Sequence, residues 1–172
     1  MATTANDPSN IRLGACSVTW GGVDLGYTQG GVVVTIGSSK HDTKVDQEGD
    51  TPVDSYIMSR TCSVKVPMVE TTVDKLTSIL SGTGGTSASG VLSVTTGVGT
   101  SLRSGAKALV LHPTSRPSTD TSEDFTIPLA NTTGDLSFNY EVDRERVFEI
   151  TFEAFPDATT KVLFTYGGTT GS

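Results

Sequence analysis

The sequence predicts a mainly β protein, a sandwich or barrel, with a single helix laid over the sheet. Apolar residues take every second position in several segments, which is the pattern of half-buried strands. Turn-forming sequences separate these segments at short intervals, without alternating helical segments between them. The 172 residues, 19 of them glycine, fit one domain that is large enough to bury a core.

Two segments show this alternation most clearly. Residues 61–68, TCSVKVPM, place four apolar side chains on one face: Cys62, Val64, Val66 and Met68. Residues 146–157, RVFEITFEAFPD, do the same with Phe148, Ile150, Phe152 and Ala154. The opposite faces carry Thr61, Ser63 and Lys65 in the first segment, and Glu149, Thr151 and Glu153 in the second. Both segments therefore predict half-buried strands with one wet face.

The other strands are expected in segments where the same tendency is weaker. They are residues 11–19, 31–37, 40–46, 91–96, 106–112, 124–130, 136–142 and 162–166. Turns are expected between them at residues 20–22, 28–31 and 131–135 and in the Gly/Ser/Thr-rich segment 82–90. Spacing this regular favours a sandwich or barrel.

One segment has helical rather than alternating periodicity. In VETTVDKLTSIL, four apolar residues recur at helical spacing: Val69, Val73, Leu76 and Leu80. Thr71 and Asp74 resemble a capping box, with Asp in place of the usual Glu. The segment predicts an amphipathic helix over residues 70–81 that ends at Gly82. Its apolar stripe is more often core packing than a groove for a partner.

The chain is expected to form one domain over residues 11–166, with flexible segments at 1–10 and 167–172. Both ends are rich in small polar residues and lack apolar periodicity. The first ten residues show neither the basic nor the apolar region of a secretory signal, and no segment has the apolar length of a membrane helix. We therefore expect a soluble protein that is made in a cytoplasm and does not insert into a membrane.

The charge is negative and unevenly placed. The formal net charge is -7, and ten carboxylates between Asp120 and Asp157 face only Arg144 and Arg146. Tight binding to a nucleic-acid backbone needs Lys and Arg to displace condensed counterions, so a surface of this sign repels nucleic acid. Ordinary DNA binding is not expected.

An acidic stretch, VDQEGDTPVDSYIMSR at residues 45–60, leads into the first clear strand. Four carboxylates precede its only basic residue, Arg60: Asp46, Glu48, Asp50 and Asp54. The spacing does not fit a calcium-binding EF-hand, because Gly49 precedes the third acid, Glu48 replaces a short ligand and no flanking helices are predicted. A calcium loop is therefore not expected.

Other metal and catalytic sites also lack their motifs. The candidate zinc ligands are scattered: Cys16, His41, Cys62 and His112. The two cysteines lie in predicted strands, where reduced, buried thiols are favoured over a disulfide. There is no G-x-S-x-G elbow and no G-K-[ST] phosphate loop, and any acidic β protein offers carboxylate pairs by chance. We expect no metal, no cofactor and no enzymatic activity.

Three segments resemble the tail tube, or major tail, proteins of long-tailed bacteriophages. Residues 20–34, WGGVDLGYTQGGVVV, are similar to the family's opening strand, turn and second strand. DQEGDTPVD at 46–54, followed by VPMVET at 66–71 and the predicted helix, resembles its long loop, third strand and flanking helix. FEITFEAFPD at 148–157, with Leu-Phe and Tyr-Gly-Gly shortly after, resembles its closing strand pair. The middle of the chain matches only in strand rhythm.

The resemblance implies a fold of two packed antiparallel sheets with one flanking helix. It also implies a structural virion protein: six copies form a ring, strands of each copy join a continuous inner barrel, and rings stack into a hollow tail tube. DNA passes through this tube during ejection into the host, without specific binding. The implied partners are further copies of the chain and other tail proteins, such as the tape measure, the tail terminator and the tail tip. Tube proteins of type VI secretion share this architecture.

The resemblance also suggests where the assembly surfaces lie. Residues 38–57, a long loop between strands, would contact the adjacent ring through alternating charges: Asp42, Lys44, Asp46, Glu48, Asp50 and Asp54. The solvent-facing side of the two strands with the clearest alternation supplies the candidates for the lumen: Thr61, Ser63, Lys65, Glu149 and Glu153. Neighbouring acids would offset the charge of Lys65, and a negative lumen would repel passing phosphates.

The alternative from another class is a carbohydrate- or receptor-binding β-sandwich. Such a module needs an exposed aromatic platform. The sequence offers Trp20 and four tyrosines, which are spread among the predicted turns and strands. The sequence therefore gives little support for an aromatic platform of this kind.

Overall fold

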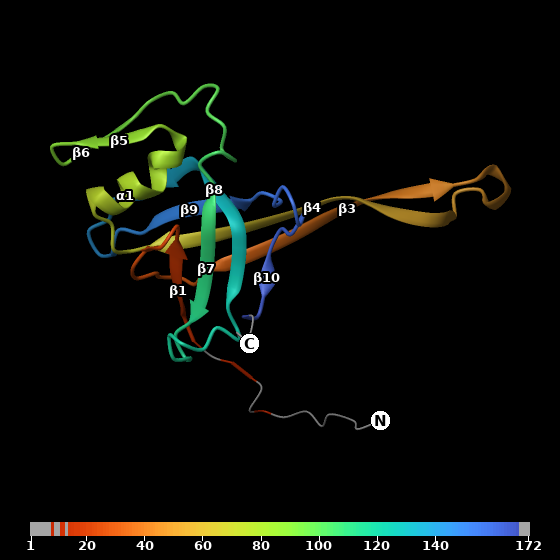
Figure 1. Ribbon diagram of the computed structural model, residues 1–172, viewed down its shortest axis with the longest axis horizontal. Helices are drawn as coiled ribbons and strands as arrows, with labels where there is room; N and C mark the ends of the chain where they lie inside the picture. Colours follow the sequence, from red (N-terminus) through yellow and green to blue (C-terminus); the bar gives the residue numbers. More distant parts are fainter. Residues whose placement is uncertain (1–7, 9–10, 13, 169–172) are drawn as a thin grey trace.

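The protein consists of a β-sheet body from which a two-stranded arm extends, as Figure 1 shows for the computed structural model. The structure describes residues 8, 11–12 and 14–168. A large antiparallel sheet makes up most of the body, and a small two-stranded sheet and one α-helix lie together at one side of it. This architecture confirms the predicted fold class, mainly β with two antiparallel sheets and one helix.

The large sheet has the strand order β2-β1-β7-β8-β9-β4-β3, and β10 pairs with β8 outside this path. Its strands are β1 (Cys16–Trp20), β2 (Val23–Asp24), β3 (Val33–Lys44), β4 (Pro52–Met68), β7 (Lys107–Pro113), β8 (Phe125–Ser137), β9 (Phe148–Ala154) and β10 (Thr165–Tyr166). The two segments with the clearest alternation become neighbours, because β9 pairs with β4 from Ser63↔Glu153 to Met68↔Phe148.

The core lies on the apolar face that the alternation predicted. Cys62, Val64, Val66 and Met68 of β4 are buried, and so are Phe148, Ile150 and Phe152 of β9. Trp20 packs against Phe152 with ring centroids 5.7 Å apart, and its indole N–H donates to the carbonyl of Ala130 at 2.9 Å. Burying a tryptophan requires a partner of this kind for its N–H.

The helix and the small sheet pack on each other. The helix α1 covers Val73–Leu80, and Ile79 reaches the core. Its N-cap is Thr72, whose hydroxyl accepts from the backbone N–H of Lys75 at 3.3 Å, so the capping box proposed for Thr71 and Asp74 is wrong by one residue. A 3₁₀ turn, Ser81–Thr83, continues the helix past the predicted end at Gly82.

The expected loop at residues 82–90 contains a strand. Gly85–Ala88 (β5) pairs with Val91–Val94 (β6) around a turn at Ser89 and Gly90, which both have positive φ. Small polar residues lack the alternation that marks a strand with a buried face, and β5 is exposed after Gly85. Its pairing therefore left no pattern in the sequence.

Two predicted breaks between strands are wrong. β8 runs unbroken through residues 131–135, the expected turn, because a bulge between Thr132 and Leu136 takes up the extra residues. Asn131 and Thr132 are buried in this strand. Likewise, the segments 31–37 and 40–46 form one strand, β3, with a register shift between Ser39 and Lys40.

The structure confirms the remaining predicted strands only in part. Residues 138–142 are not a strand, and the first and last strands are shorter than expected, beginning at Cys16 and Thr165. The segments expected to be flexible, 1–10 and 167–172, lie outside the described residues apart from residues 8, 167 and 168. In the described part of the chain, no helix combines the length and the apolar character that crossing a membrane requires.

Candidate functional site

The arm is the part of the β3–β4 hairpin that leaves the body: residues 38–44, the turn 45–51 and residues 52–60 (Figure 1). The predicted loop 38–57 is therefore mostly strand, and only the turn, with the 3₁₀ helix Asp46–Glu48, is irregular. Every residue from 44 to 61 is exposed. The first buried residue after the arm is Cys62, which lies beyond the predicted end of the loop at residue 57.

Both long edges of the arm lack a neighbouring strand. Among the described residues β3 pairs only with β4, and β9 borders β4 only from Ser63 onward. The backbone N–H and C=O groups that point outward along residues 52–62 of β4 therefore have no strand to bind. Unpaired edges of this length are sites at which another chain can add.

The arm also carries large apolar side chains that contact little of the body. Four of them are at least half exposed: Val53, Tyr56, Ile57 and Met58. A two-stranded hairpin is marginally stable on its own in water, and exposed apolar groups mark interaction surfaces. The edges and the side chains thus identify the arm as a surface suited to another protein chain.

The six predicted contact residues all lie on the arm: Asp42, Lys44, Asp46, Glu48, Asp50 and Asp54. Lys44 Nζ lies 3.1 Å from Asp50 Oδ1, and Lys40 Nζ lies 3.1 Å from Asp42 Oδ1. The Ser55 hydroxyl and Lys40 together lower the pKa of Asp42 below its usual value. Residues 40–54, the tip of the arm, carry five carboxylates and two lysines, so the tip is negatively charged.

The five predicted lumen residues also come together, as a polar face on β4 and β9: Thr61, Ser63, Lys65, Glu149 and Glu153. Ser63 stands opposite Glu153, and Lys65 Nζ lies 2.7 Å from Glu149 Oε2. Neighbouring acids do offset Lys65, as expected. The core covers the other side of these strands, so the polar face is the free side of the sheet at the root of the arm.

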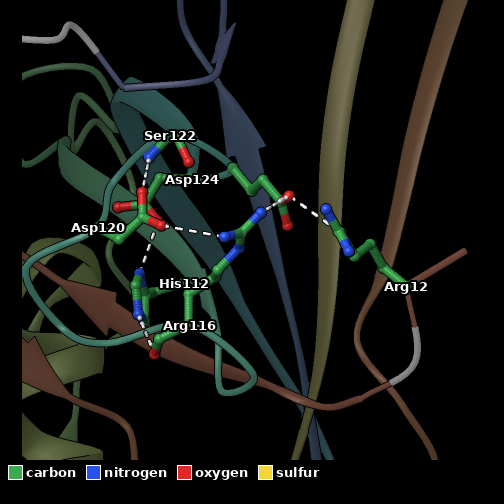
Figure 2. A network of polar contacts seen from close by, with 7 residues as sticks. Arg12, His112, Arg116, Asp120, Ser122 and Asp124 are labelled. Atoms are coloured by element: carbon green, nitrogen blue, oxygen red, sulfur yellow. Dashed lines mark hydrogen bonds and ion pairs between the residues drawn. The ribbon is translucent and has the colours of Figure 1, made fainter. Parts of the chain in front are cut away.

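Sequence reasoning missed a network of charged side chains between β7 and β8 (Figure 2). His112 Nδ1 lies 2.7 Å from Asp124 Oδ1, and its Nε2 lies 3.3 Å from the carbonyl oxygen of Arg116. Arg116 Nη1 lies 3.3 Å from Asp120 Oδ2, and its Nη2 lies 2.6 Å from Glu123 Oε1. His112 was predicted to be a strand residue, which is confirmed, but its partners come from the loop after the strand.

This network ties the start of the chain to the loop. Arg12 Nε lies 3.1 Å from Glu123 Oε1, the same oxygen that Arg116 binds. The two guanidinium groups lower the pKa of Glu123, while hydrogen bonds to Ser122 lower that of Asp120. The stretch HPTSRPSTDTSED, with one His, one Arg and three acids in 13 residues, was the only signal for it.

The network occupies both ring nitrogens of His112. A general base needs a free ring nitrogen facing a nucleophile or a substrate, yet both nitrogens of His112 face acceptor oxygens of the protein. No group of three or more His, Cys, Asp or Glu side chains converges on a metal position within residues 8, 11–12 and 14–168. Cys16 and Cys62 are free thiols, and burial raises the pKa of both.

No model of a known protein family matches the sequence, and no protein of curated function matches it.

Proposed function

We propose that this chain is the tail tube subunit of a long-tailed bacteriophage. In this proposal six copies form a ring, and rings stack into a hollow tube through which DNA is ejected. The chain is then a structural virion protein without catalytic activity, assembled in the cytoplasm of the bacterial host. The resemblance of its three sequence segments to tail tube proteins suggests this role.

The arm is the observation that supports the proposal most directly. Residues 44 to 61 are all exposed, and in the described part of the chain no strand pairs with the outward edge of β4 along residues 52–62. Tyr56, Ile57 and Met58 add exposed apolar surface. A monomer gains nothing from extending such a ribbon into water, whereas an assembly stabilises it by burying those groups between copies.

The polar face at the root of the arm suits the wall of a channel for DNA. Lys65 is its only cation, and it is paired with Glu149, which leaves Glu153 in excess. Repeated in every copy of a ring, this excess would give a lumen of negative sign. Such a wall repels phosphates and keeps DNA from adhering as it passes.

Deleting residues 46–54 tests the role of the arm. The deletion joins Val45 to Ser55, so that Thr43, Lys44 and Val45 close a short turn between Asp42 and Ser55, which already pair. The body, including the β4–β9 pairs, is left intact. We expect the variant to keep the circular dichroism spectrum of a folded β protein and to lose the ability to form tubes in negative-stain images.

A matched control changes the tip of another exposed hairpin. Ser89→Gly replaces a residue with positive φ by glycine, and the β5–β6 hairpin should tolerate it. We expect this control to form tubes like the wild type. Tubes of normal length from the deletion variant would rule out the proposed role of the arm.

A further inference from the structure

A notch lies at the point where the arm leaves the body. Its volume is about 750 Å³, and it is lined by residues 60–63 of β4, by the end of β9 and by residues 161–164. β9 stops pairing with β4 at Ser63, so the backbone edge of residues 60–62 faces the notch without a neighbouring strand in the described chain. An extended segment could therefore bind along this edge.

The notch overlaps the polar face at Thr61, Ser63 and Glu153, but two cations make it basic. Arg60 and Lys161 both line it, and within the residues that the structure describes neither forms an ion pair. Glu153 is the only carboxylate in the lining. Val162, Leu163 and Phe164 supply apolar surface beside the two cations. The notch thus fits a segment that is acidic and partly apolar.

The tip of the arm has this chemistry. Asp46 and Glu48 are exposed and have no ion pair among the described residues, and Val53 is half exposed next to Pro52. The tip cannot reach the notch of its own chain. About ten residues of extended strand separate Asp50 from Arg60, or roughly 33 Å at the rise of a β-strand. The occupant must be the tip of another copy.

We propose that the notch beside Arg60 and Lys161 binds the acidic arm tip of a second copy of the chain, head to tail. The contact buries two unpaired cations against carboxylates and places Val53 against the apolar lining. Two different surfaces meet, so each copy can offer a tip to one neighbour and a notch to another, which lets the assembly grow without closing. This inference rests on the proposed function, because it names the partner surface of the arm.

Disulfide trapping tests the contact directly. One protein carries Glu48→Cys and the other Lys161→Cys, each with Cys16→Ser, while the buried Cys62 is left in place. The two are mixed with oxidised glutathione and run on a non-reducing gel. We expect a cross-linked dimer in the mixture, and much less of it when Arg144→Cys replaces Lys161→Cys. Equal yields with Lys161→Cys and Arg144→Cys would overturn the inference.

Charge reversal tests the electrostatic basis of the contact. We expect Arg60→Glu with Lys161→Glu to raise the concentration needed for assembly at least about tenfold. The new glutamates would face the carboxylates of the arm tip, and like charges in contact weaken binding by more than about one kcal/mol. Adding Asp46→Lys and Glu48→Lys to the same chain should restore assembly. Arg144→Glu with Arg146→Glu, which makes the same change in net charge, should leave assembly near that of the wild type.

The outcomes separate this inference from the proposed function. Wild-type tubes together with unimpaired assembly of the notch variant would overturn the notch contact and leave the tube proposal standing. A cross-linked dimer from a chain that forms no tubes would support the notch contact and contradict the tube proposal. A notch variant that fails to assemble and is not rescued by the tip substitutions would overturn the charge pairing.

Discussion

His112 and Asp124 meet at the junction of β7 and β8, with His112 Nδ1 2.7 Å from Asp124 Oδ1. The other ring nitrogen faces the Arg116 carbonyl oxygen at 3.3 Å. Only the protonated imidazole can donate to both acceptors. Accordingly, the pKa of His112 is raised, chiefly by the hydrogen bond to Asp124 and despite partial burial.

This contact predicts a pH-dependent stability. The unfolded chain has a histidine pKa of about 6.5, and the folded pKa is higher. The contribution of His112 is therefore complete below about pH 6.5 and is lost as the pH rises through the raised, folded pKa. We expect the melting temperature to fall over this range by calorimetry, and to fall less in His112→Gln.

His41→Gln is the control, because His41 lies exposed on the arm. It should keep the wild-type pH profile. If His112→Gln and the wild type lose stability in parallel as the pH rises, protonation of His112 does not stabilise the folded protein.

The buried tryptophan gives a second prediction. Trp20→Phe removes the donor to the Ala130 carbonyl and leaves space against Phe152. We expect the free energy of unfolding to fall by about 2 to 3 kcal/mol, from an unsatisfied acceptor and a small cavity. Urea unfolding followed by circular dichroism measures it. Tyr27→Phe, at a residue that is 80% exposed, should change stability by less than about 0.5 kcal/mol.

The orientation of the polar face gives a third prediction. In a Cys16→Ser chain, Lys65→Cys places a thiol on the polar face outside the notch, and Ser87→Cys places one on β5. A maleimide attached to a protein-sized polymer should reach both thiols in the monomer. After assembly we expect only Lys65→Cys to become protected, because a lumen excludes the polymer. Unchanged labelling of Lys65→Cys in tubes would place this face on the outside.

The sequence predicted the parts of the fold in which a strand has one buried face. Val64 and Phe152 belong to runs whose alternation marks the core side, and the polar face followed from the same alternation. The helix was predicted for the same reason, since Leu76 and Leu80 of the predicted apolar stripe pack toward the interior. In each case the burial of one side imposes a period that can be read locally.

The parts that were missed have no such period. On the arm both faces are exposed, so residues 52–60 show neither alternation nor a boundary, and the sequence predicts a loop where the structure has a long strand. The network of His112 brings together Arg12 and residues 112–124, which only the folded chain places side by side. The notch likewise depends on where β9 stops pairing with β4, which is a matter of register.

The central claim is that this chain assembles into a tube, and negative-stain electron microscopy of the purified wild-type protein tests it most directly. The account predicts rings of six copies or hollow tubes of uniform diameter, whose number increases with protein concentration. Discrete monomers at every concentration would contradict it, and monomers that also bind a glycan array would favour a carbohydrate-binding module.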